Sequence, residues 1–137
     1  PADPGGETNW GISKRAYPLI DITALTKGQA KNLYQRDYWI KGRCGELPEG
    51  LRGIYFDMCV NLGIRRAVKI LQRACNSVMS RRLAVDGVLG NLTLAALVYV
   101  EPDRLRMVRL KYYGDIIHKR PSLAKYWRGW SRRAMEV

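Results

Sequence analysis

Apolar residues recur three or four positions apart along most of the chain, the spacing of one face of an α-helix. Glycine and proline interrupt this pattern and divide it into segments. The segments predict helices at about 27–39, 51–62, 64–76 and 92–99, and two more that begin near Pro102 and after Pro121. No stretch alternates apolar and polar residues over any length. We therefore expect a mainly α fold.

Local signals mark several ends of these helices. Thr26 and Gln29 have the spacing of a capping box, in which each side chain bonds the other's backbone N–H. Gly63 is a suitable helix C-cap. Asn91 or Thr93 can cap the start of the helix expected at about 92–99. Residues 1–25 are rich in glycine and proline, so we expect loops there, with at most a small hairpin near 10–22.

The chain has 137 residues, which predicts one compact domain over 1–137. No apolar run approaches the roughly 18 residues of a membrane span. The chain begins at Pro1 rather than Met, and we expect the true N-terminus to lie upstream.

The charge is strongly positive, with 24 Lys and Arg against 12 Asp and Glu. Between Arg104 and Met135 there are ten Lys or Arg and one acid, Asp115. Such a balance predicts a polyanionic partner: nucleic acid, an anionic cell wall or an anionic membrane surface. Solvated helix faces are the simpler alternative.

Metal binding is not indicated, because His118 is the single histidine and the cysteines form no CxxC pair. We expect three free thiols. Cys59 and Cys75 lie in apolar helical patterns and should be core residues, whereas Cys44 lies in an expected loop where it could be reactive. No cofactor is predicted.

The densest group of unusual residues is the segment from Asp3 to Ile12, where polar side chains lie among glycines and prolines. Loops of this kind often present functional groups from a rigid scaffold, although an ordinary turn has the same composition.

This segment resembles the second half of the signature of the glycoside hydrolase family 108 muramidases, Asp-Pro-Gly-Gly-x-Thr-x-x-Gly-Ile. Further resemblance runs in order along nearly the whole chain. It includes Tyr38-Trp39, Asp57 with Asn61, the stretch from Asp86 to Thr93, and Trp127 to Trp130. The family comparison implies a lysozyme-like helical domain with a loop-rich N-terminus. In it, residues 1–63 form the catalytic half and 64–137 a peptidoglycan-binding half.

The resemblance also implies the chemistry. These enzymes cut the bond between N-acetylmuramic acid and N-acetylglucosamine, and the general acid is the Glu of a Glu-Gly-Gly-Tyr segment that falls ahead of Pro1. By comparison with phage-type lysozymes, Asp3 and Thr8 position the attacking water. One Asp and one Thr cannot protonate a leaving group at neutral pH, so we expect the 137 residues alone to be nearly inactive. Glu7 occupies a variable position of the motif and is not taken as the acid.

Five further side chains are candidates for sugar binding: Asn9, Tyr38, Trp39, Asp57 and Asn61. Asp57 and Asn61 are four residues apart and face the same side of one helix. Their alternative role, which we favour, is a buried polar pair that ties this helix to a neighbouring loop. For Tyr38 and Trp39 the alternative is core packing.

The stretch from Asp86 to Thr93 is expected to form a tight turn that enters a helix. It is either a folding element or a second wall-binding site.

We therefore expect a monomeric peptidoglycan hydrolase of the lysozyme or endolysin type. Its positive charge would draw it to the anionic envelope, and it would act on glycan strands in the periplasm or outside the cell after synthesis in the cytoplasm. A non-catalytic wall-binding or secretion-accessory protein is the alternative. A nucleic-acid-binding protein is less favoured, because no recognised nucleic-acid motif is present.

Overall fold

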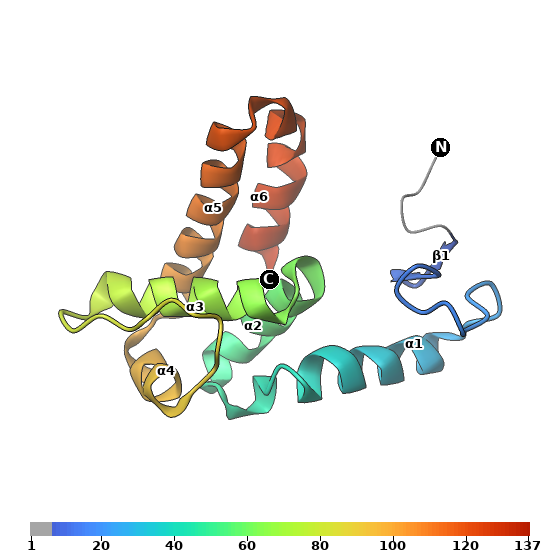
Figure 1. Cartoon of the computed structure of the whole chain (residues 1–137), viewed down its shortest axis with the longest axis horizontal. Coiled ribbons are helices and arrows are strands. Elements are labelled where there is room, and N and C mark those ends of the chain that lie inside the picture. The colour runs from blue at the N-terminus through green and yellow to red at the C-terminus, as the bar shows by residue number, and fades with distance from the viewer. Residues whose placement is uncertain (1–6) are drawn as a thin grey trace. The chain divides into compact units, whose positions relative to one another are not determined.

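Helices dominate residues 7–137, the part of the chain that the computed structural model describes (Figure 1). Contacts divide the chain into two units, one up to Asp37 and the other from Tyr38 to Val137. The mainly α fold expected from the sequence is confirmed. The expected single domain and its division after residue 63 stay predictions.

The first unit begins with a short hairpin of β1 (Thr8–Asn9) and β2 (Ile12–Ser13), paired antiparallel. Its turn residues, Trp10 and Gly11, both have positive φ, at 55° and 77°, as hairpin turns of two residues often require. The Tyr34 hydroxyl donates to the Trp10 carbonyl at 3.0 Å, and a Cβ on Gly11 would collide with it. A hairpin is therefore present, but it is shorter and starts earlier than expected.

Helix α1 (Lys27–Tyr34) follows, and the predicted capping box between Thr26 and Gln29 is confirmed by both hydrogen bonds, at 2.9 and 3.2 Å. The predicted helix continues to residue 40, but its last part, η1 (Gln35–Ile40), is a π-helix. Ile12, Ile22, Leu25, Ala30 and Leu33 form a small core within this unit.

The second unit contains most of the helices. They are η2 (Cys44–Glu46), α2 (Glu49–Leu62), α3 (Ile64–Val78), α4 (Asn91–Ala96), η3 (Leu97–Tyr99), α5 (Pro102–Lys119), η4 (Pro121–Tyr126) and α6 (Trp127–Glu136). Helices α2 and α3 pack on each other and on α5, and α6 runs back along α5 (Figure 1).

Helix α3 is the centre of this unit because its apolar stripe is buried. Ala67, Val68, Leu71 and Cys75 are at most 1% exposed, as the periodicity predicted. Gly63 ends α2 with φ 88°, so its expected role as a C-cap is confirmed.

Two local expectations are wrong. Neither Asn91 nor Thr93 caps α4: the helix begins at Asn91 after Gly90 and has no side-chain cap, and the Thr93 hydroxyl accepts from Gln72 instead. Cys44 is not an accessible loop thiol. It lies in η2 and is 0% exposed, because the main core packs over it. Cys59 and Cys75 are buried and all three cysteines are free, as expected.

Candidate functional site

The segment that carries the predicted catalytic residues is only partly described. Asp3 lies outside the described residues. Thr8 is exposed in β1, opposite Ser13. The hairpin therefore presents Thr8 at the surface of the first unit.

Asn9 and Trp10 attach this hairpin to the loop that precedes α1. The Asn9 amide nitrogen donates to the carbonyls of Ile22 and Leu25 at 3.2 and 3.3 Å, and the Trp10 indole N–H donates to Leu25 at 3.0 Å. These bonds cross-link segments 13 to 16 residues apart. They make Asn9 a support of the backbone next to Thr8.

Tyr38 and Trp39 belong to the second unit. Both are half-buried and pack against the main core. The Trp39 and Phe56 rings pack in an edge-to-face arrangement with the centroids 5.4 Å apart. This geometry fits the core-packing alternative and leaves part of each ring accessible.

Asp57 and Asn61 of α2 join a network of polar side chains that spans three helices. The Arg109 guanidinium of α5 donates to the Asp57 carboxylate at 2.7 Å and to the Asn61 amide oxygen at 3.3 Å. The Tyr113 hydroxyl donates to the same Asn61 oxygen at 2.5 Å. Arg133 of α6 binds both carboxylate oxygens of Asp57 at 3.0–3.2 Å.

This network makes Asp57 an anchor between helices. The Arg109 side chain is 0% exposed, so its charge depends on Asp57, which is 20% exposed. The arrangement fits the structural role favoured from the sequence, in which Asp57 and Asn61 form a polar pair that ties α2 to a neighbour. The neighbours are helices α5 and α6 rather than the loop that was expected. One nitrogen of Arg109, Nη1, is buried without a hydrogen-bond partner among the residues described.

Sequence reasoning missed Arg109, Arg133 and Tyr113. Arg109 lies in a helix of many basic residues, and nothing local distinguishes the buried arginine from its exposed neighbours. Arg109 can be told from its neighbours only by its position opposite Asp57, across the interface between α2 and α5.

The turn at Asp86–Thr93 is held by one buried side chain, Gln72 of α3. Its amide oxygen accepts from the backbone N–H groups of Asp86 and Gly87, both at 3.0 Å. Its nitrogen donates to the Asp86 carboxylate at 2.8 Å, to the Val88 carbonyl at 3.1 Å and to the Thr93 hydroxyl at 3.3 Å. The hydrogen bond from Gln72, with that from the Val88 N–H, lowers the pKa of Asp86 below its ordinary value. The turn therefore has a folding role.

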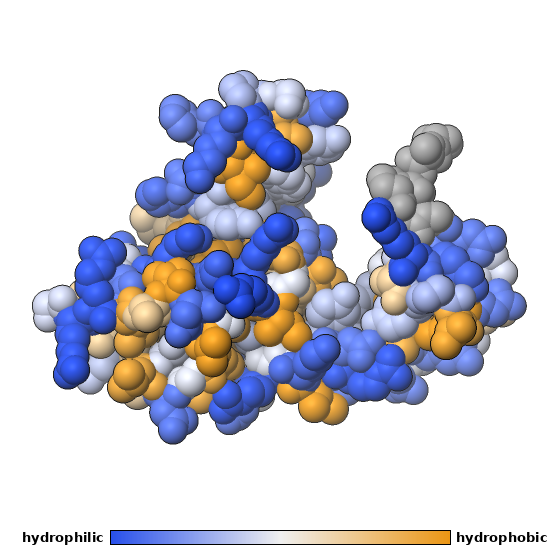
Figure 2. Space-filling model, in the orientation of Figure 1, coloured by the Kyte–Doolittle hydropathy of each residue, from blue (hydrophilic) through white to orange (hydrophobic). Residues whose placement is uncertain are grey.

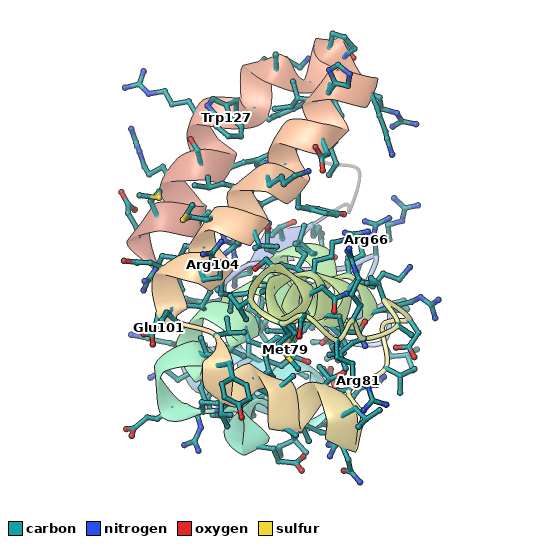
Figure 3. The ribbon with its side chains drawn as sticks, turned by 90° about the vertical axis from the view of Figure 1, so that its left-hand side faces the viewer. Arg66, Met79, Arg81, Glu101, Arg104 and Trp127 are labelled. Carbon is teal, nitrogen blue, oxygen red and sulfur yellow. The ribbon has the colours of Figure 1, made fainter. Side chains whose placement is uncertain are left out.

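Two cavities flank the segment between α3 and α4. One, of about 520 Å³, lies between this segment, α3 and α5. The other, of about 640 Å³, lies towards α4, with Met79 and Arg81 in its wall (Figure 3). Exposed apolar side chains line the second cavity; they are Val88, Leu92 and Tyr99. Figure 2 shows patches of hydrophobic surface among hydrophilic ones around α4. Arg82 lines both cavities.

Residues 7–137 contain no cluster of three or more His, Cys, Asp or Glu that could hold a metal ion. Within the same range, every helix is too short or too polar to cross a membrane.

Comparison with known proteins identifies the family. The model of glycosyl hydrolase 108 matches residues 1–63, and that of a predicted peptidoglycan domain matches residues 66–135. Among solved structures, that of Brucella abortus SagA is 30% identical and superimposes with a TM-score of 0.75, covering 97% of this chain and 78% of that one. No curated protein sequence matches the chain.

The chain belongs to glycosyl hydrolase family 108, and the expected lysozyme-like helical fold is confirmed. Its two matched regions support a glycoside hydrolase that acts on peptidoglycan. Because peptidoglycan lies outside the cytoplasm, such an enzyme acts outside the cytoplasm.

Proposed function

We propose that the protein is an N-acetylmuramidase that cleaves the bond between N-acetylmuramic acid and N-acetylglucosamine. The observation that carries this proposal is the match to glycosyl hydrolase 108 over residues 1–63, the region that includes the Asp3–Ile12 motif. The predicted peptidoglycan domain over residues 66–135 supports the wall polymer as substrate.

The reaction needs a protonated carboxyl at the leaving oxygen and, for inversion, a carboxylate that activates water, with the two groups about 6.5–9.5 Å apart. In this proposal a glutamate ahead of Pro1 is the acid, and Asp3 and Thr8 hold the water. The exposed position of Thr8 on a cross-linked hairpin supports this role, because a water must be held still to attack in line.

Substrate binding is proposed for the accessible parts of Asn9, Tyr38 and Trp39. The half-buried rings of Tyr38 and Trp39 are supported from behind by the core, which suits stacking against a sugar ring. Asp57 and Asn61 are assigned a positioning role, because their oxygens contact Arg109, Arg133 and Tyr113. The protein's net charge of +12 supports attraction to an anionic envelope.

A digest of purified peptidoglycan tests the proposal. The full product of the gene, with any residues ahead of Pro1, is incubated with sacculi and the fragments are analysed by mass and by reducing-end sugar. We expect reducing N-acetylmuramic acid. Reducing N-acetylglucosamine, or release of peptides alone, would show a different bond specificity. Sacculi that are bound but not cut would favour the non-catalytic wall-binding alternative.

Variants in the motif separate catalysis from folding. Asp3→Asn and Thr8→Val are expected to lower the rate by about 10²–10⁴-fold if they hold the water. Asp21→Asn is the matched control, because Asp21 is exposed in the same unit and its carboxylate accepts a hydrogen bond from the neighbouring Thr23 hydroxyl at 2.9 Å.

A further inference from the structure

The cavity of about 520 Å³ between α3 and α5 lies wholly within the second unit. Its walls come from α3, from the segment after α3, and from α5. All of its lining residues fall within the match to the predicted peptidoglycan domain. Its volume is in the range of about 300–1,000 Å³ typical of small-ligand sites.

Positive charge converges on this cavity. Arg73, Arg82, Lys111 and Lys119 line it, against one acid, Asp115. Lys111 and Asp115 pair with each other at 3.0 Å. Within residues 7–137, no hydrogen bond or ion pair engages the charged groups of Arg73, Arg82 and Lys119. Like charges around a concave surface raise the local concentration of anions, so the cavity favours a ligand with more than one negative group.

The rest of the lining limits the kind of anion. Val85, Val108 and Ile116 supply apolar surface, and the half-buried ring of Tyr112 lies beside them. A phosphate or sulfate alone would make no use of this surface, whereas an anion with methyl or methylene groups would bury it.

The wall of the cavity is held in place. The Asn76 side chain of α3 exchanges two hydrogen bonds with the backbone of Leu83, at 2.7 and 3.0 Å. These bonds fix the residue next to Arg82, so part of the site is preorganised, which lowers the entropic cost of binding.

We propose that this cavity binds the peptide stem of peptidoglycan. The stem has an alanine on either side of a glutamate and a diaminopimelate, so it offers several carboxylates and small apolar side chains together. Its carboxylates would meet Arg73, Arg82 and Lys119, and its alanine methyl groups would lie on Val85, Val108 and Ile116. This inference rests on the proposed function, and it names which part of the wall polymer the second half of the chain recognises.

The test measures binding of an isolated stem peptide, L-alanyl-γ-D-glutamyl-meso-diaminopimelyl-D-alanine, to the full chain by NMR titration. We expect shifted amide signals in α3, in residues 79–90 and in α5. The same peptide with its carboxylates amidated is expected to lose binding.

Arg73→Gln and Lys119→Gln should each weaken binding of the peptide about tenfold, the effect of losing one charge-assisted hydrogen bond. Arg66→Gln on α3 and Arg104→Gln on α5 are matched controls. They remove the same charge from exposed positions of the same helices that do not line the cavity, and both residues are labelled in Figure 3. The controls should leave affinity within about twofold.

Three results would overturn the inference. Equal weakening by all four variants would show that net charge alone attracts the peptide. Tighter binding of a polyphosphate, or of a nucleic acid, with the same dependence on Arg73 and Lys119 would assign the cavity to a phosphate polymer. If the protein releases reducing N-acetylmuramic acid but does not bind the peptide, the cavity is not a peptide site, and the proposed muramidase function is unaffected. Because the peptide has no glycosidic bond, failure of the muramidase assay does not affect this test.

Discussion

Asp57 of α2 and Arg109 of α5, 52 positions apart in the chain, form an ion pair of 2.7 Å in which the arginine side chain is fully buried. The second oxygen of Asp57 binds Arg133 of α6 at 3.0 Å. One carboxylate thus holds three helices together, at a position for which the sequence offered a sugar-binding role and the structural role that we favoured.

Replacing Asp57 by Ala is expected to reduce the free energy of unfolding by about 3–5 kcal/mol, because it leaves a buried charge without its partner. Urea denaturation followed by circular dichroism measures the change. The control is Asp115→Ala, which breaks the exposed pair with Lys111 and should cost no more than about 0.5 kcal/mol. An unchanged midpoint for Asp57→Ala, with weaker sugar binding, would return Asp57 to the substrate site.

Gln72→Met keeps the approximate size of the side chain and removes every hydrogen bond to the turn at Asp86–Thr93. Since the N–H groups of Asp86 and Gly87 then lose their acceptor, we expect a loss of about 1–3 kcal/mol in the free energy of unfolding. Hydrogen exchange at these two amides should accelerate. Gln35→Met, at an exposed position, is the control and should change neither quantity. Retained protection at both amides in Gln72→Met would mean that the turn holds without the glutamine.

Gly87→Ala tests the backbone of the same turn. Gly87 has φ 77°, and an added Cβ would lie 2.7 Å from the Arg65 side chain and 3.2 Å from its carbonyl oxygen. Strain and collision together should cost about 1–3 kcal/mol in thermal or urea unfolding. Gly53→Ala is the opposite case, since it lies in α2 with open space at the Cβ and should stabilise by about 0.5–1 kcal/mol. If Gly87→Ala left stability unchanged or raised it, the assigned conformation of Gly87 would be wrong.

The pKa of the Asp86 carboxyl should lie below its ordinary value, because Gln72 and the Val88 N–H donate to the charged form. A group whose pKa is lowered by folding stabilises the fold above its unfolded pKa. That contribution is lost as the pH falls through the lowered, folded value. A carboxyl ¹³C titration measures the shift, and Gln72→Met should move the midpoint upward. A midpoint that Gln72→Met leaves in place would assign the shift to another cause.

The three thiols should be protected in the native protein. Burial raises the pKa of Cys75 to about 11, and a hydrogen bond with Cys44 together with burial raises the pKa of Cys59. The hydrogen bond with Cys59 lowers the pKa of Cys44, so burial alone protects that thiol. Since all three sulfurs are buried, a disulfide reagent at pH 8 should label them only after unfolding. Ser80→Cys, at an exposed position, supplies a reactive control thiol. Rapid labelling of Cys44 in the folded protein would restore the reactive role first expected for it.

The sequence by itself determined the helical class, the buried stripe of α3, the capping box at Thr26 and the cap at Gly63. These features are local, because helical periodicity and capping involve residues within a few positions of one another. Short stretches of sequence are therefore enough to predict them. The motif from Asp3 to Ile12 likewise carried the family resemblance without any knowledge of the fold.

Only the tertiary structure decided which polar residues meet. The burial of Arg109 against Asp57, the hold of Gln72 on the turn at Asp86–Thr93, and the cavity lined by Arg73 and Lys119 all join separate elements. An arginine that is buried and one that faces water look alike in a basic helix, because the difference lies in the helix packed against each. For the same reason Cys44, which the sequence placed in an accessible loop, proved to be a core residue.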